Sequence, residues 1–458
     1  MPESPAASTV SRRDPVRSFL RLFTDVREGE TTQALLLTLL FYLLLLSYYL
    51  IKPVREALLL VDADAPRMKS YLSGTQAFLF IFVVKAFSAL ASRVARHRLI
   101  SRVTLFFILN LAVFYLLHLA GVPTKGLGIA FFIWIGIFNY LVVAQFWGFA
   151  NDLYSEEAGK RLFPLIAFGA TFGAVSGSWI AGRLAVPLGI YGLMLLSAAG
   201  LAGCIGLTLV IHRRDVRTCG AADRTREEPL RPGGGFRLVF RSRYLILIAL
   251  IIGLYNFVNA TGEYIISDVA TRRALQAVAS GTAGGLGMNE IIARFFAGYQ
   301  SLTNLIALVF QLFLVSRIFR WIGVGGALLV LPFLSLGGYA FISFGATLLL
   351  VRWVKALENG TDYSLMNTTK AALFLVTPRE EKYKAKVAID TFFVRGGDAL
   401  AALSVFLGTT FLGLAIEKFA LLNVAGVVVW IVLCLLAIRE YRKKRARAAA
   451  ADPAATRP

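Results

Sequence analysis

The sequence predicts an all-α membrane protein with about twelve transmembrane helices in two six-helix halves. Of its 458 residues, 57% are hydrophobic and only 16% are charged, and the mean hydropathy is +0.68. Soluble domains carry about 25% charged residues. Apolar runs of about twenty residues, enough to cross a hydrocarbon core, recur from end to end. Because lipid offers the backbone no hydrogen-bond partners, each run is expected to be helical, and the short alternating segments of a transmembrane barrel are absent.

The order of the apolar runs predicts the domain organisation. The predicted spans are 34–60, 71–92, 99–121, 127–150, 162–183, 187–211, 244–266, 291–316, 319–338, 341–374, 387–412 and 419–438. The polar stretch 212–243, rich in arginine and glycine, separates an N-terminal half at 34–211 from a C-terminal half at 244–438. Two six-helix halves around a central site are the arrangement of major-facilitator transporters, which this layout resembles.

Basic residues gather in alternate loops and predict the orientation. They are dense before the first span, between the second and third spans, in the central stretch and after the last span. The positive-inside rule then makes 1–33 a cytoplasmic N-terminal segment, 212–243 a basic cytoplasmic linker and 439–458 a basic, disordered cytoplasmic tail. The formal charge of +21 is therefore a topology signal, and no nucleic-acid partner is expected.

The end of the first span carries charges at membrane depth. The segment Lys-Pro-Val-Arg-Glu at 52–56 places Lys52, Arg55 and Glu56 at i, i+3 and i+4, on one helix face, and Pro53 is expected to interrupt the helix. Charged groups inside a membrane usually face a cavity or one another. The alternative is that the segment is the outer end of the helix at the interface.

The later spans carry polar faces of the same kind. The fourth span ends at Asp152, and the seventh presents Asn256, Asn259 and Glu263 at helical spacing. In the tenth span a polar stripe is predicted, and its members are Arg352, Lys355, Asn359, Asp362 and Lys370. A stripe of this length is not expected to face lipid.

Two further patterns favour structural roles. In the eleventh span Arg395 and Asp398 are spaced for a salt bridge, and glycines at 169, 173 and 177 predict close helix packing. The sequence lacks a phosphate-binding Gly-x-x-x-x-Gly-Lys-Ser/Thr loop, a His-Glu-x-x-His motif and a nucleophile elbow. We therefore expect a protein that is not an enzyme and has no metal or cofactor.

Four segments resemble the bacterial and plastid ATP/ADP translocases, a family of nucleotide antiporters. Segment 52–58 is similar to the family's Arg-Asp-x-x-Lys-Asp-x-Leu, which puts Lys52 on its Arg and Arg55 on its functional Lys. Segments 146–152 and 160–163 resemble Phe-Trp-Gly-Phe-Ala-Asn-Glu and Lys-Arg-Phe-Tyr, which puts Asp152 on a functional Glu. Glu263 occupies the position of a second such Glu.

The fourth segment lies in the tenth and eleventh spans. Residues 363–370 and 384–390 resemble Tyr-Ser-Leu-Phe-x-x-x-Lys and Lys-Gly-Lys-Ala-Ala-Val-Asp, which puts Lys370 on a functional Lys. The chain departs from the family pattern at Arg55, Asp152 and Pro53. Arginine and lysine are not equivalent phosphate ligands, so the first change alters the expected geometry.

The resemblance implies a secondary transporter that exchanges ATP for ADP by alternating access. The predicted substrate-binding residues are Lys52, Arg55, Asp152, Glu263, Lys355, Asp362 and Lys370. Tyr255 and Tyr363 are candidates for stacking on the base. The implied partners are the nucleotide and the lipid bilayer, and the implied location of the monomer is a bacterial inner membrane. Two alternatives stay open: an ion-coupled transporter of another organic anion, and a membrane scaffold that transports nothing.

Overall fold

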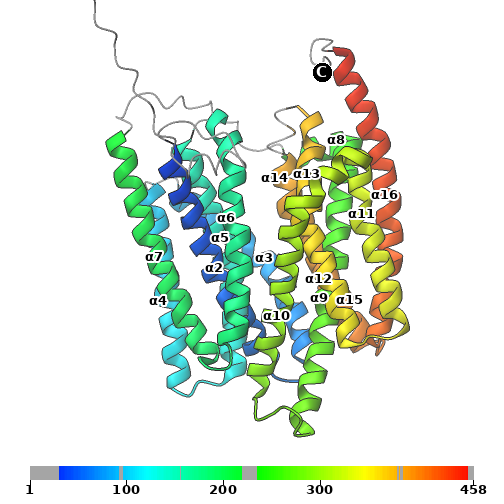
Figure 1. Cartoon of the computed structure of the whole chain (residues 1–458). Helices are drawn as coiled ribbons and strands as arrows, with labels where there is room; N and C mark the ends of the chain where they lie inside the picture. Colours follow the sequence, from blue (N-terminus) through cyan, green and yellow to red (C-terminus); the bar gives the residue numbers. More distant parts are fainter. Residues whose placement is uncertain are drawn as a thin grey trace, which may run out of the picture.

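The protein, as a computed structural model, is described for residues 30–91, 96–154, 156–218, 235–378, 381 and 385–451. Within these residues the regular structure is entirely helical. Figure 1 shows two groups of helices side by side. The first group contains α2 (Thr31–Leu59), α3 (Ala65–Ala91), α4 (Arg96–Leu119), α5 (Thr124–Leu153), α6 (Glu156–Leu184) and α7 (Gly189–Thr218). This all-α, two-group architecture confirms the predicted fold class.

The second group begins after the short helix α8 (Gly235–Arg241). It contains α9 (Arg243–Ala279), α10 (Met288–Val309), η1 (Phe310–Leu314), α11 (Val315–Phe344), α12 (Leu348–Thr361), η2 (Asp362–Met366), α13 (Asn367–Leu373), η3 (Phe374–Val376), α14 (Lys386–Ala388), η5 (Ile389–Phe393), α15 (Val394–Thr410) and α16 (Ile416–Ala451). Among them η1, η2 and η5 are π-helical turns inside longer helices.

Nine helical stretches in the described part of the chain are long and apolar enough to cross a membrane. One of them, Met288–Phe344, contains two passes, because the chain turns back at Gly323 with φ 67°. Glycine adopts this left-handed conformation without the steric cost of a Cβ. Together with the more polar α3 and the stretch from α12 to α13, the described chain makes twelve passes, and the protein is a multi-pass membrane protein.

The glycines predicted to promote packing lie between α6 and α2. A Cβ on Gly169, Gly173 or Gly177 would collide with the α2 backbone, at Thr38, Tyr42 and Leu46 respectively. Small residues at this spacing let two helix backbones approach closely, which is how membrane helices gain van der Waals contact. The packing prediction is confirmed, and it fixes the position of α2, whose last turns carry Lys52 and Arg55.

The two groups meet along two helix seams. The helix α3 of the first group packs against α15 and α9 of the second, and α10 of the second group packs against α6 and α2 of the first. In Figure 1, α3 and α10 lie in the middle of the molecule, between the other helices. Side chains of α2, α3, α9 and α10 therefore point toward a shared space at the centre.

The structure differs from two expectations, namely that Pro53 interrupts the first helix and that the tenth span begins at residue 341. The first helix continues through Pro53 to Leu59, because packing against α5, α6 and α7 supports it where the proline removes one hydrogen bond. The tenth span begins at Leu348 and not at 341, since the chain between α11 and α12 turns at Gly345.

The structure also describes part of the segments predicted at the two ends of the chain and in the linker. The tail predicted to be disordered from residue 439 instead continues α16 to Ala451, because its Arg, Lys and Ala residues favour helix. Residues 1–29 of the N-terminal segment and 219–234 of the linker lie outside the described residues. The start of α2 and the end of α16 lie at the same end of the bundle, as an even number of passes requires (Figure 1).

Candidate functional site

A cavity of about 410 Å³ lies between the two halves. Its volume falls within the range of about 300–1,000 Å³ that small-molecule sites occupy. Its charged lining consists of four cations and three carboxylates: Lys52, Arg55, Lys69, Arg395, Glu56, Glu263 and Asp398. The polar and aromatic lining includes Tyr48, Tyr49, Asn139, Asn259, Tyr299, Asn304, Asn359 and Tyr363. Both halves contribute to this lining, so a ligand held here would touch both.

The last turns of α2 supply the first group of charges. Arg55 forms an ion pair with its neighbour Glu56 and donates from Nε to Glu56 Oε1 at 2.9 Å. The guanidinium of Arg55 also lies 5.0 Å from the centre of the Phe132 ring. Lys52 Nζ lies 4.9 Å from the centre of the Tyr49 ring. Aromatic faces thus hold both cations at the cavity, Lys52 by its ring contact and Arg55 beside its partner Glu56, and the cavity explanation for this segment is favoured over an outer helix end.

Lys69, near the start of α3, connects the two halves. Its Nζ lies 2.8 Å from Glu56 Oε2 in its own half. Across the interface it donates to Ser267 Oγ at 2.8 Å and lies 3.7 Å from Glu263 Oε2. Only 7% of the Lys69 side chain is exposed. Attraction between such poorly hydrated charges is stronger than at an open surface, so Lys69 favours the closed contact between α3 and α9.

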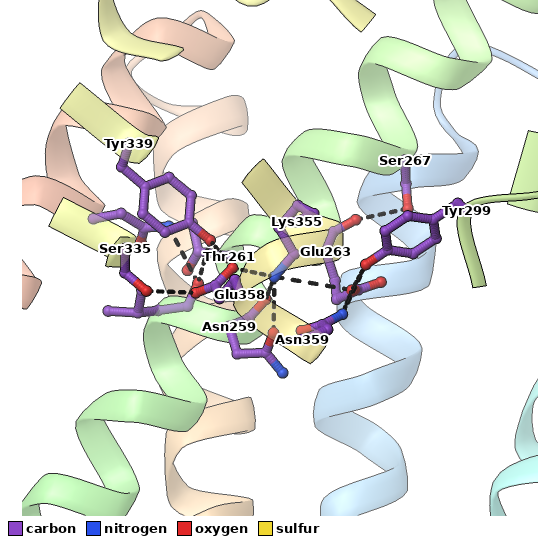
Figure 2. A network of polar contacts seen from close by, with 12 residues as sticks. Asn259, Thr261, Glu263, Ser267, Tyr299, Ser335, Tyr339, Lys355, Glu358 and Asn359 are labelled. Atoms are coloured by element: carbon purple, nitrogen blue, oxygen red, sulfur yellow. Dashed lines mark hydrogen bonds and ion pairs between the residues drawn. The ribbon is translucent and has the colours of Figure 1, made fainter. Parts of the chain in front are cut away.

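Glu263 on α9 is the carboxylate on which the charges converge (Figure 2). Its Oε1 accepts hydrogen bonds from Tyr299 Oη at 3.2 Å and from Asn359 Nδ2 at 3.1 Å. Lys355 Nζ lies 3.9 Å from the same oxygen. The side chain keeps 28% of its surface exposed, on the cavity side. Glu263 is therefore fixed in direction by neighbours but still accessible to a ligand.

Behind Glu263, a buried ion pair belongs entirely to the second half. Lys355 Nζ lies 2.7 Å from Glu358 Oε2, and neither side chain is exposed. Glu358 also accepts from Tyr339 Oη at 2.8 Å and from Ser335 Oγ at 3.2 Å, while Lys355 donates to Asn259 Oδ1 at 2.8 Å. A buried pair is tolerated when such bonds satisfy it. Lys355 does not line the cavity.

The polar stripe expected in the tenth span is divided in the structure. Lys355 and Asn359 point toward Glu263, whereas Arg352 lines a separate groove. Beyond them η2 adds a residue to the turn and shifts the later side chains around the helix axis. Asp362 and Lys370 then pair with each other at 3.4 Å, outside the cavity lining. The members of the predicted stripe therefore have three different surroundings: the neighbourhood of Glu263, the separate groove, and the pair of Asp362 with Lys370.

The remaining predicted residues separate in the same way. Asp152 lies exposed near the end of α5 and does not line the cavity. Tyr363 lines the cavity and is 41% exposed. Tyr255 is buried beneath Lys370, whose Nζ lies 5.1 Å from the ring centre. The expected salt bridge between Arg395 and Asp398 is present at 3.0 Å.

The sequence analysis did not identify Lys69, Tyr299 or Glu358 as site residues. Lys69 precedes the second predicted span, which begins at residue 71, so its position gives no sign of a charge at membrane depth. Tyr299 carries no charge, and its role follows only from the approach of α10 to α9. Glu358 could have been found, because it follows Lys355 at the i, i+3 spacing of a helical ion pair.

Known proteins resemble this chain in sequence and in fold. No protein-family model matches it. It is 24% identical over 456 residues to ADP,ATP carrier protein 1 of Chlamydia muridarum (strain MoPn / Nigg), covering 85% of this chain and 83% of the relative. It is 23% identical over 461 residues to ADP,ATP carrier protein 1 of Chlamydia pneumoniae, covering 85% of this chain and 86% of the relative.

Among solved structures, several transporters share the fold. The nucleoside transporter NupG matches with a TM-score of 0.62 at 12% identity, covering 88% of this chain and 99% of that structure. A bacterial homologue of the human lysosomal transporter Spinster, inward-facing and unoccupied, matches with a TM-score of 0.61 at 14% identity, covering 92% of this chain and 99% of that structure. The POT family transporter PepTSo matches with a TM-score of 0.62 at 12% identity, covering 90% of this chain and 98% of that structure. The fold is therefore that of major-facilitator-like transporters.

Proposed function

We propose that this protein is a secondary transporter that exchanges nucleotides, ATP for ADP, by alternating access of its two halves. The observation that carries the proposal is the group of cations Lys52, Arg55 and Lys69 around one accessible carboxylate, Glu263, in a cavity that both halves line. The likeness to ADP,ATP carrier proteins of Chlamydia supports the choice of substrate. The proposed location is a bacterial inner membrane, with both termini cytoplasmic and the protein a monomer.

The chemistry of the cavity suits a phosphate-bearing ligand. Lys52 is held on an aromatic ring, so its charge is available for charge-assisted hydrogen bonds to phosphate oxygens, and Arg55 would offer the same bonds in exchange for its pairing with Glu56. Asn139, Asn259 and Asn304 offer donors and acceptors for a base or a ribose. Tyr363 offers an exposed ring for stacking. Cations and polar groups thus cover both parts of a nucleotide.

Lys69 supplies the proposed link between binding and movement. Its amino group contacts Glu263 and Ser267 across the interface. Phosphate oxygens entering the cavity would compete with Glu263 for Lys69, and the contact between α3 and α9 would weaken. A ligand can shift such an equilibrium only by binding one arrangement better than the other. With Lys69 and Glu263 in contact, the empty carrier would change slowly between its two orientations. The return step would then require a bound nucleotide, and the result would be exchange of one nucleotide for another.

The proposal is tested by counter-exchange in proteoliposomes. We expect labelled ATP to enter vesicles preloaded with ADP and to enter empty vesicles far more slowly. Lys69→Gln should lower the exchange rate about tenfold or more, because hydrogen bonds to charged groups are worth about 1.5–3 kcal/mol. The matched control is Lys125→Gln, whose ion pair with Asp62 lies exposed and outside the cavity; it should exchange like the unaltered protein.

A second candidate is an ion-coupled transporter of another organic anion. It is supported by Glu263, a carboxylate exposed to the cavity, which would take up a proton only in a state of the transporter in which Lys69 has moved away from it. In the same vesicles, uptake that follows a pH gradient and is indifferent to nucleotide inside would support this candidate and overturn exchange. Uptake that requires internal nucleotide at every pH gradient would exclude it.

A further inference from the structure

A second concavity, of about 760 Å³, lies on the other side of α10 from the central cavity. Phe295, Gly298 and Ser301 of α10 face this groove, whereas the central cavity uses Phe296, Tyr299 and Gln300 of the same helix. The rest of the groove is lined by the end of α6, by the loop between α9 and α10, and by α12. The groove therefore crosses the seam between the halves at the end of the bundle opposite the end of α16 (Figure 1).

The charge of the groove is entirely positive. Arg183 of α6, Arg294 of α10 and Arg352 of α12 line it, and its lining contains no carboxylate. Among the residues that the structure describes, none of the three guanidinium groups forms a salt bridge, and the buried Nε of Arg352 has no hydrogen-bond acceptor. Buried polar groups are normally satisfied, so an unmatched guanidinium at a groove indicates an external acceptor.

Local packing keeps these arginines directed along the groove. The guanidinium of Arg183 lies 5.3 Å from the centre of the Trp179 ring, and that of Arg352 lies 5.8 Å from the Phe295 ring. Gly298 provides space for the second contact, since a Cβ there would lie 3.1 Å from Arg352 Nη2. Aromatic faces hold the guanidinium planes without satisfying their N–H donors.

The surface beside the groove is apolar and exposed. Trp179, at the edge of the groove, is 55% exposed, and Phe172, about two helical turns earlier on α6, is 48% exposed. Leu305 of α10 and Trp353 of α12 are 48% and 47% exposed. Exposed side chains of this kind on membrane helices face acyl chains, and tryptophan favours the level of the headgroups. A ligand with a phosphate at the arginines and hydrocarbon along these residues would match both surfaces.

We propose that this groove binds the phosphate headgroup of an anionic phospholipid. Arginine forks pair with phosphate oxygens through two hydrogen bonds, so three arginines in a groove between membrane helices suit such a headgroup. The bound lipid contacts α6 of one half and α10 and α12 of the other. It therefore favours the arrangement of the halves in which all three arginines converge.

Thermal unfolding of the full chain in a neutral detergent tests this site. Added phosphatidylglycerol should raise the unfolding midpoint, whereas phosphatidylcholine and inorganic phosphate should not. Titration with phosphatidylglycerol measures its apparent affinity. Three single variants should each lower this affinity about fivefold: Arg183→Gln, Arg294→Gln and Arg352→Gln. If the variant that carries all three replacements fails to fold, Arg294→Gln alone tests the site, because Arg294 is exposed and its loss leaves no buried group unpaired.

A control variant removes the same charge elsewhere. Arg273, Arg317 and Arg320 are exposed and do not line the groove, so replacing all three with Gln should leave the phosphatidylglycerol response unchanged. Equal responses from Arg294→Gln and the unaltered protein would overturn the site. Stabilisation by inorganic phosphate as large as that by phosphatidylglycerol would overturn the assignment to lipid.

Discussion

Lys69 and Lys355 approach different oxygens of the same carboxylate, with their Nζ atoms 3.7 Å from Oε2 and 3.9 Å from Oε1 of Glu263 respectively. Lys69 comes from the other half of the molecule and lines the cavity. Lys355 is sealed within its own half against Glu358. The comparison shows that distance to a carboxylate does not define a role. Lys69 contacts Glu56 of its own half and Glu263 of the other half, so it joins the two halves, whereas Lys355 pairs with Glu358 on its own helix and fixes the geometry around Glu263.

The largest expected effect concerns the buried pair. Lys355→Met should lower the free energy of unfolding by about 3–5 kcal/mol, because it leaves Glu358 charged and unpaired in the interior. The double variant Lys355→Met/Glu358→Leu should regain most of the loss, since it removes both charges. Thermal unfolding of the purified protein measures both changes. A single variant as stable as the unaltered protein would contradict a fixed, ionised pair.

The next effect concerns the cations of the cavity. Lys52→Gln should weaken ATP binding about ten- to hundredfold, the loss of one charge-assisted bond to phosphate. Its unfolding midpoint without nucleotide should stay near that of the unaltered protein, because Lys52 contacts ring faces and not a buried anion. Isothermal titration with ATP measures the first quantity. Unchanged affinity would remove Lys52 from the proposed site.

The smallest effect distinguishes Lys370 from Lys52. Lys370 pairs with Asp362 outside the cavity, and both side chains are partly exposed. Lys370→Gln should therefore weaken ATP binding only about threefold or less, in keeping with the modest worth of partly exposed pairs. The same titration compares the two variants. A loss as large as that of Lys52→Gln would bring Lys370 into the site and support the role that the family resemblance implies.

Particular residues show how far sequence reasoning reaches. The charges of Lys52, Arg55 and Glu263 stand out at membrane depth because hydrocarbon makes an unshielded charge costly, and these three line the cavity. Lys69 does not stand out, because it precedes an apolar run and only the contact of α3 with α9 brings it to Glu263. Asp362 and Lys370 share a helix face as predicted, but the sequence does not show that they pair with each other outside the cavity, because the π-helical turn between them leaves no periodic signal.

The sequence by itself determined the helical membrane class, the twelve passes, the close packing of the helix that carries the glycines at 169, 173 and 177, and the presence of charges in the interior. These features follow from local rules: apolar length, glycine spacing and the cost of a charge in lipid. Only the tertiary structure decided which charges meet. Glu263 faces Lys69 across the two halves, Lys355 approaches Glu263 from another helix, and three arginines converge on an outer groove. Such pairings depend on how distant helices pack and rotate, and the order of residues along one helix does not encode that.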